Sequence, residues 1–230
     1  MSGIVGSSHN IRGSGVVAKL GTDGQVFTST GAGLTQGFED AAGGGAWTLI
    51  KTLTSDGSDA TMDFVDGTDD VVLDSTYKQY LFTWMDIHPE DNSVYFEFQA
   101  NAAGGSGFNE TITSTAFRAY HDESDSSTHL GYYAGGADLA QQTIFQRVCI
   151  TVNNAADNST CGTLRLFNPS STTFVKHFTV QSQTIIDDDE ANQVYVGGYI
   201  NTTSAIDEIQ WKWSAGEIQA GTISLYGLTI

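Results

Sequence analysis

The chain has 230 residues, of which 40% are hydrophobic, and it contains 26 Gly but only 2 Pro. This apolar content is enough for one packed core, which excludes a wholly disordered chain. With Lys+Arg 9 against Asp+Glu 27, the formal net charge is -18. A surface this acidic repels phosphate backbones and anionic lipid, so we expect no nucleic-acid partner and no membrane insertion.

The first segment, residues 1–45, is rich in Gly, Ser and Thr and nearly free of large aromatic residues. Such a stretch cannot fill a core of its own. It is therefore either a flexible tail or an extended glycine-rich arm that becomes ordered against a partner chain. We expect residues 1–45 to form a docking and oligomerisation arm and residues 46–230 to form the folded domain. The first five residues lack the basic start and apolar run of a secretion signal.

From residue 46 onward, β-branched and aromatic residues alternate with polar ones, and no helical periodicity appears. The expected strands are 46–53, 61–65, 71–73, 77–87, 93–100, 111–120, 129–133, 143–152, 163–167, 174–180, 193–200, 206–213 and 222–228. The pattern predicts an all-β fold, an antiparallel β-sandwich of jelly-roll type, with a β-barrel as the alternative. The last strand is expected to be central in its sheet and to pair far back in the sequence.

Residues 77–87 and 93–100 are expected to pair as a hairpin. Phe96 and Phe98 would then face the core, and Glu97 would point to solvent. By the same spacing, Trp211 and Trp213 share one strand face and are expected in the core. Tyr132 and Tyr133 lie beside a glycine-rich loop, and we expect them to be exposed contacts.

The two cysteines, Cys149 and Cys161, flank residues 153–158, which are typical of a hairpin turn. They could face each other across that turn and form a bridge if their Cα atoms come within about 7 Å. Two free thiols are the alternative for a protein assembled in the cytoplasm. A zinc site is not indicated, because no His lies nearby in the sequence.

Catalytic carboxylates are the first enzymatic possibility, with Glu97, Glu110 and Glu208 and the run 187–190 as candidates. A glycosidase needs two carboxyl groups about 5–10 Å apart, which the sequence does not establish. None of the five His lies beside a Gly-x-Ser-x-Gly nucleophile motif, and no phosphate-binding loop is present. We therefore predict a protein that is not an enzyme and has no cofactor.

Among metals, calcium is the one that the acidic residues could bind. Closely spaced aspartates at positions 56, 59, 63, 66, 69 and 70 do not fit an EF-hand, so only casual Ca²⁺ binding is left open. His121 and His129 bracket an acidic loop that could hold a metal or form a polar hairpin tip. As possible surface contacts we take His121, His129, Tyr132, Tyr133, Asp187, Asp188 and Asp189.

Residues 19–33, KLGTDGQVFTSTGAG, resemble a run common in tail-fibre and other virion proteins of marine tailed phages. Further similarity to a marine phage structural family lies in segments 87–89, 111–115, 119–121, 166–171, 198–203 and 223–227. The resemblance covers most of residues 87–230 together with the short N-terminal run. It carries no catalytic motif, so it implies no functional residues.

The resemblance implies a structural protein on the virion surface, assembled in the cytoplasm of the bacterial host. Residues 1–45 would dock on other virion proteins, and several copies would associate, a homotrimer being expected. The sandwich would then contact a host surface glycan or protein, as in a tail-associated fibre or adhesin. Capsid decoration or cement, or a head fibre, is the alternative, and a polysaccharide depolymerase is a more remote one.

Overall fold

In the computed structural model the described residues are 25–28, 37–40, 46–186 and 189–228. The chain divides into two units, Met1–Gly45 and Ala46–Ile230. In the first unit, β1 (Gln25–Thr28) pairs antiparallel with β2 (Gly37–Asp40). Most of the predicted docking arm lies outside the described residues.

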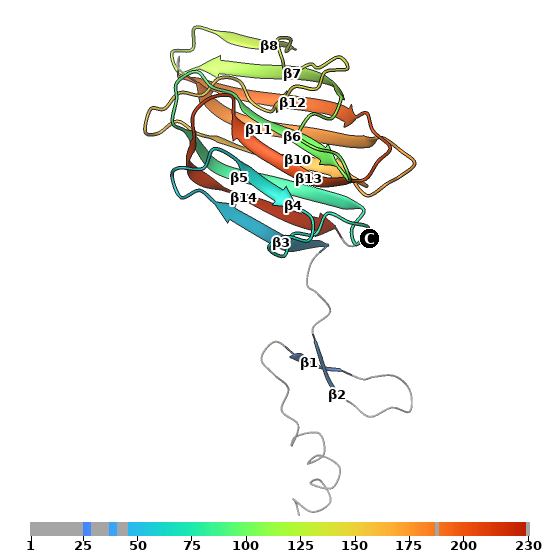
Figure 1. Ribbon diagram of the computed structural model, residues 1–230. Coiled ribbons are helices and arrows are strands. Elements are labelled where there is room, and N and C mark those ends of the chain that lie inside the picture. The colour runs from blue at the N-terminus through green and yellow to red at the C-terminus, as the bar shows by residue number, and fades with distance from the viewer. Residues whose placement is uncertain (1–24, 29–36, 41–45, 187–188, 229–230) are drawn as a thin grey trace, which may run out of the picture. The chain divides into compact units, whose positions relative to one another are not determined.

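The second unit is an all-β sandwich of two antiparallel sheets, consistent with the predicted jelly-roll type. Figure 1 shows the larger sheet as a stack from β8 at the top to β3 at the bottom, with the smaller sheet in front of it. In strand order, the eight-stranded sheet consists of β3 (Trp47–Thr54), β14 (Ile218–Leu228), β5 (Gln79–Pro89), β10 (Thr160–Phe167), β11 (Lys176–Ile186), β12 (Glu190–Ile200), β7 (Ile112–Asp122) and β8 (Thr128–Tyr132). The four-stranded sheet consists of β4 (Met62–Val65), β13 (Ile206–Trp213), β6 (Phe96–Ala102) and β9 (Gln146–Arg147).

Alternation along the strands places one apolar face of each sheet in the space between them. On β11, every second residue from Lys176 to Ile186 is buried. On β13, Trp211 and Trp213 are buried, as predicted. The last strand, β14, lies inside its sheet between β3 and β5, which confirms the predicted long-range pairing.

An aromatic cluster fills the middle of the core. Trp211 has Trp84 at 5.3 Å and both Phe96 and Phe98 at 5.4 Å between ring centroids. Trp84 comes from the larger sheet and the other three rings from the smaller one, so the cluster joins the two layers. Gly162 on β10 leaves the room that the Trp84 indole occupies, because a Cβ atom there would overlap that ring.

The predicted hairpin of 77–87 with 93–100 is wrong. β5 pairs with β10 and β14, whereas β6 belongs to the other sheet and pairs with β13 and β9. The chain crosses between layers after Pro89, and Phe96 thereby packs against Trp84 from the opposite sheet. A hairpin would have placed these two rings side by side in one sheet.

Two further strand predictions need correction. Residues 71–73 form no strand; Val71 and Leu73 are buried, and the Leu73 backbone N–H donates to Asp66 Oδ1 at 2.8 Å. Of 143–152, only β9 is a strand, with an isolated bridge from Val152 to Val94.

Both cysteines are free thiols, and the hairpin expected to bring them together is absent. Cys149 is buried, and its sulfur accepts a hydrogen bond from the Phe96 N–H of the smaller sheet at 3.3 Å. Cys161 lies on β10 of the larger sheet, where it accepts from the Asp86 N–H at 3.3 Å. No helix among the described residues is long and apolar enough to cross a membrane.

Candidate functional site

One row of side chains crosses the solvent-facing side of the eight-stranded sheet. Directly paired positions of neighbouring antiparallel strands point to the same face, so the register defines the row. From β8 to β3, the members of this cross-sheet row are Tyr132, Phe117, Tyr195, Gln181, Thr163, Thr83, Ser224 and Thr52. Aromatic rings thus occupy one end of the row, and the remaining positions carry an amide followed by hydroxyl groups.

The aromatic end of the row is open to solvent. Phe117 is 48% exposed and Tyr132 is 62% exposed. The Phe117 ring stacks on Tyr195, with centroids 4.8 Å apart and an interplanar angle of 13°. Large apolar surface at solvent is unfavourable unless a partner covers it, so this end is a candidate binding surface.

Three adjoining hollows lie along the same face. One is lined by Thr163, Arg165, Thr179, Val180, Gln181 and Tyr195. The next shares Thr163 and Gln181 with it and extends to Gln183 and Gln193. The largest, of about 540 Å³, shares Cys161 and Gln183 with the second and ends beside the β7–β8 loop. Together they form a shallow groove along β10 and β11 that crosses the row at Thr163 and Gln181.

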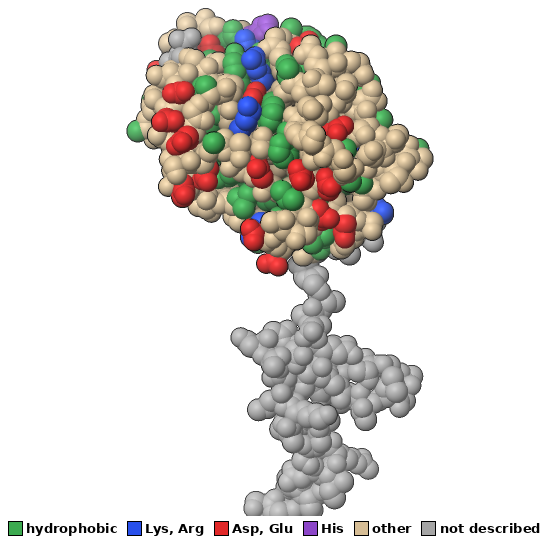
Figure 2. Space-filling view, viewed as in Figure 1, with side chains coloured by type: hydrophobic (Ala, Val, Ile, Leu, Met, Phe, Trp, Pro, Cys, Tyr) green, Lys and Arg blue, Asp and Glu red, His purple; other side chains and the backbone are tan. Residues whose placement is uncertain are grey.

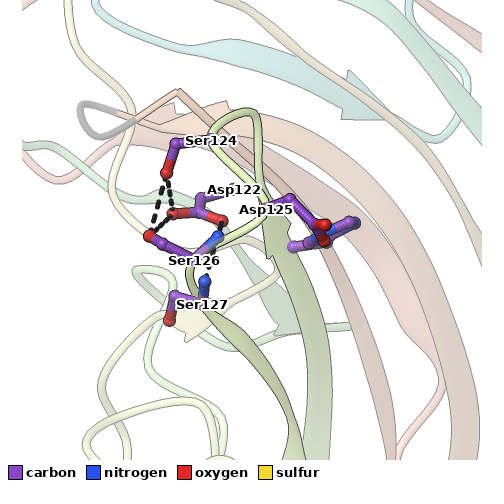
Figure 3. Close-up of polar contacts among 6 residues, drawn as sticks. Asp122, Ser124, Asp125, Ser126 and Ser127 are labelled. Atoms are coloured by element: carbon purple, nitrogen blue, oxygen red, sulfur yellow. Dashed lines mark hydrogen bonds and ion pairs between the residues drawn. The ribbon is translucent and has the colours of Figure 1, made fainter.

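The loop between β7 and β8 closes the end of this groove and is built around one carboxylate. Asp122 accepts hydrogen bonds from the Ser124 and Ser126 hydroxyls and from the Ser126 and Ser127 backbone N–H groups (Figure 3). These donors favour the ionised form and hold the pKa of Asp122 well below its usual range. Asp125, at φ 56°, turns away and meets His121 Nε2 at 3.0 Å.

The structure brings two of the predicted contact loops together. The Glu123 N–H donates to the Asp189 carbonyl at 3.1 Å, and both residues line the largest hollow with His121. Tyr132 belongs to the cross-sheet row. His129 and Tyr133 lie on the opposite face of the β7–β8 ribbon, where Tyr133 packs partly against the core. Asp187 and Asp188 lie outside the described residues.

Glu97 does not point to solvent as predicted; only 8% of it is exposed. Its outward face is covered because the chain crosses over β6, where Gln99 Nε2 donates to the carbonyls of Glu110 and Ile144, each at 3.0 Å. Burial raises the pKa of Glu97, opposed by the positive charges of Lys212 and Arg147. Lys212 Nζ lies 3.8 Å from Glu97 Oε1.

The three candidate catalytic acids lie on or over the outer face of the smaller sheet, and each has a structural partner. Glu110 Oε1 accepts from the Ala102 N–H at 3.2 Å, and Glu208 Oε2 accepts from Asn101 Nδ2 at 3.0 Å. Asn101, the register partner of Glu208, is four residues from Glu97, which separates these two acids by about 13 Å along the strand direction. That spacing exceeds the separation of a glycosidase pair, whereas Glu110 and Glu208 bond to consecutive residues of β6 and are therefore closer together. None of the three lines the groove.

Among the described residues, no group of three or more His, Cys, Asp or Glu side chains is placed to hold a metal ion. Several of the closely spaced aspartates instead stabilise turns. Asp56, for example, accepts from the backbone N–H and the hydroxyl of Ser58. Asp56 therefore has a local structural use in its turn.

Phe117 and Tyr195 are the principal site residues that the sequence analysis missed. For each of them the sequence contains a pattern that could have identified it. Tyr195 lies between Val194 and Val196, which are buried, so it is a large aromatic residue on the outward phase of its strand. Phe117 likewise follows the buried Ala116. An aromatic ring on the polar phase of an alternating strand is a sign of a surface contact.

Comparisons of the chain with protein-family models, with curated proteins and with solved structures give no significant match.

Proposed function

We propose that this chain is a non-enzymatic surface protein of a tailed-phage virion and that its sandwich binds sugars of the host surface through the cross-sheet row. The observation that carries the binding role is the row itself: three aromatic residues followed by Gln181 and Thr163 across an open groove. The virion role is supported by the resemblance of residues 19–33 and most of residues 87–230 to marine phage structural proteins.

The row suits a saccharide because its two ends offer two kinds of contact. A sugar ring has an apolar C–H face, which the Phe117 and Tyr195 rings can cover, and hydroxyl groups, which Gln181 and Thr163 can bond. Aromatic side chains supply this area with few rotatable bonds to immobilise. Convergent polar groups beside apolar surface are the usual composition of a ligand site.

An open groove of this kind favours weak binding at each site, and multiple copies would compensate. A trimer that presents three grooves to one cell surface raises the effective affinity without any new contact. In this proposal residues 1–45 associate the copies and dock them on other virion proteins. We place the protein at the tail, as a fibre or adhesin, with capsid decoration as the alternative.

The binding role is tested with the full-length chain on immobilised bacterial polysaccharides. The double variant Phe117→Ala/Tyr195→Ala is expected to lose at least about ten-fold in affinity, because two large apolar contacts are removed. Phe174→Ala is the matched control, since Phe174 is 68% exposed but lies outside the row. Equal loss in the control variant, or no binding by the unaltered chain, contradicts the proposal.

The virion role is tested separately by antibody labelling of intact particles. Label confined to the tail supports the fibre or adhesin, label on the capsid faces supports decoration, and no label on particles rejects both. Release of reducing ends from the bound polysaccharide would overturn the non-enzymatic assignment.

A further inference from the structure

The second surface of interest lies on the other side of the β7–β8 ribbon, where positive charges are held against aromatic rings. Arg118 Cζ is 5.0 Å from the Tyr120 ring centroid and 5.2 Å from that of Tyr133. Arg147 Cζ lies 3.6 Å from the Tyr95 centroid, and its Nη1 donates to the Gly135 carbonyl at 2.7 Å. We call Arg118 and Arg147, with these three tyrosines, the arginine stripe.

The arginine stripe is unusual for a chain with 9 Lys+Arg and 27 Asp+Glu. Figure 2 shows Lys and Arg side chains gathered in a column on this face, near the end of the sandwich. Arg118 lies against the Tyr133 ring, and Arg147 bonds to Gly135 two residues further along the chain, so both arginines border the same segment. The ion pairs of the described residues are His121–Asp125 and Lys212–Glu97. Glu97 is the register partner of Arg147 and is the carboxylate beside the stripe, but it is almost fully buried and its ion pair is with Lys212.

The tyrosine rings fix the two guanidinium groups in place. Stacking covers a guanidinium face and leaves N–H groups at its edge, which match the two oxygens of a carboxylate. Both arginines are half-buried, so little side-chain freedom remains to be lost when an anion binds. Hydrogen bonds between charged groups are about twice as strong as neutral ones.

We propose that the arginine stripe binds the carboxylate groups of a sparsely charged glycan, one that carries uronic acids or similar acidic sugars among neutral ones. This inference rests on the proposed function and names the chemical class of its ligand. Phe117 and Arg118 are consecutive residues of β7 and point to opposite faces, and β8 is the edge strand beside them. One glycan chain that passes around this edge contacts the aromatic end of the row on one face and the arginine stripe on the other.

Two other anionic partners fit less well. A nucleic acid presents a continuous line of phosphates, which the net charge of -18 repels over the whole surface. A second copy of this chain carries the same net charge, so docking its carboxylates on the stripe brings two acidic bodies together. A sparsely charged saccharide places single carboxylates against the arginines without that general repulsion.

The test compares an acidic oligosaccharide with the same oligosaccharide after reduction of its carboxyl groups to alcohols. Calorimetric titration of the full-length chain is expected to give at least about ten-fold tighter binding of the acidic form at low salt. Arg118→Gln/Arg147→Gln is expected to remove this preference. The double variant should bind the carboxyl-reduced form with an affinity within about two-fold of that of the unaltered chain. Lys78→Gln is the control, because it removes one charge at an exposed position outside the stripe.

Equal affinity of the unaltered chain for the two forms overturns the inference, and so does an unchanged preference in the double variant. If Lys78→Gln weakens acidic binding as much per charge removed, compared as the logarithm of Kd, the effect is one of net charge and the inference fails. Binding of the reduced form alone rejects the arginine stripe but keeps the proposed function, whereas binding of neither form rejects both.

A second variant guards against unfolding of the glutamine protein. Arg118→Lys/Arg147→Lys keeps both charges but lacks the planar fork, and it is expected to bind the acidic form more weakly than the unaltered chain. If this variant binds the acidic form as tightly as the unaltered chain, the planar guanidinium groups are not required, and that part of the inference is overturned. Sedimentation of all variants is the check on self-association: an oligomer that dissociates when the arginines are replaced shows that a second copy occupies the stripe, which also overturns the inference.

Discussion

Phe117 and Tyr195 stack in near-parallel planes on adjacent strands, on the side of the sheet that faces solvent. This pairing adds little to the fold, because an aromatic pair contributes about 0.5–1.5 kcal/mol and Phe117 is already half-exposed. Phe117→Ala should therefore lower the free energy of unfolding by about 1 kcal/mol. Urea unfolding measures this.

Trp211 provides the comparison for that prediction. It is fully buried in the aromatic cluster, and Trp211→Ala should cost about 3–5 kcal/mol through lost packing and the cavity left behind. If Phe117→Ala costs as much as Trp211→Ala, the Phe117–Tyr195 pair is a structural element and loses its standing as a binding surface.

The positions of the strands could be predicted from the sequence better than the pairing between them. β13 coincides with the expected strand 206–213, because burial alternates from Ile209 to Trp213 even though the register shifts after Ile206. The crossing between β5 and β6 could not be read in this way. Alternation reports which residues of a strand are buried, and the polar connection after Pro89 serves a hairpin or a change of sheet equally well.

Residues of the candidate site could be predicted only where their neighbours in the sequence indicate that the side chain is exposed. Tyr132, beside a glycine-rich loop, is exposed as expected. Glu97 alternates with Phe96 and Phe98, so its pattern is that of a solvent-facing residue, and the segments that cover it, at Glu110 and Ile144, lie outside its own strand. Likewise, only the sheet register places Gln181 and Thr163 in line with the aromatic rings.

The two thiols should differ sharply in reactivity. Burial raises the pKa of the Cys149 thiol to about 12; it also raises that of Cys161, but Cys161 is only partly buried on β10. A thiolate is the reactive form, so Cys149 should resist modification until the chain unfolds. Titration with a chromogenic disulfide should therefore show one thiol in the native protein and two in denaturant. Cys161→Ser should remove the native signal; if it persists, Cys149 is accessible.

Stability should fall on the alkaline side. Burial raises the pKa of the Tyr133 hydroxyl to about 12, raises that of Cys149 to about 12, and raises that of Tyr80 further. Below their ordinary values, about 8.5 for Cys and 10 for Tyr, these groups are neutral in both states, so their contribution is fully present. Above those values the unfolded chain loses protons that the folded chain keeps, and unfolding becomes more favourable.

The measurement is the urea midpoint, expected to be level from pH 7 to about 8.5 and to fall as the pH approaches about 12. Tyr133→Phe removes one of the titrating groups and should reduce the fall above about pH 10. An equal fall in this variant would assign the alkaline loss to other groups.

Asp122 should control the order of the β7–β8 loop. Its carboxylate is the common acceptor for Ser126 and Ser127 N–H groups, so Asp122→Asn should lower the hydrogen-exchange protection of those two amides. Its lowered pKa means that this contribution is present above the ordinary value and is lost as the pH falls through the folded value. Asp125→Asn is the control, since Asn tolerates the positive φ of that position. Unchanged amide protection in Asp122→Asn would show that the turn holds without the carboxylate.

Lys176 should stabilise two loops through a single buried amino group. Its side chain is fully buried, and Nζ donates to the carbonyls of Phe174 and Thr202, both at 3.0 Å. Burial lowers the pKa of Lys176, and the charge of Glu110 opposes that shift. Lys176→Met keeps the apolar stem but leaves both carbonyls without their donor. Each unsatisfied carbonyl should lower the free energy of unfolding by about 1–3 kcal/mol at most.

Lys176→Ala should cost more, because it adds a cavity to the same loss. Urea unfolding gives the total, and hydrogen exchange in residues 171–175 and 201–205 shows whether both loops loosen together. Loosening of both loops in the Met variant supports the shared amino group as their connection. A Met variant more stable than the unaltered chain would mean that desolvation of the ammonium outweighs its two hydrogen bonds.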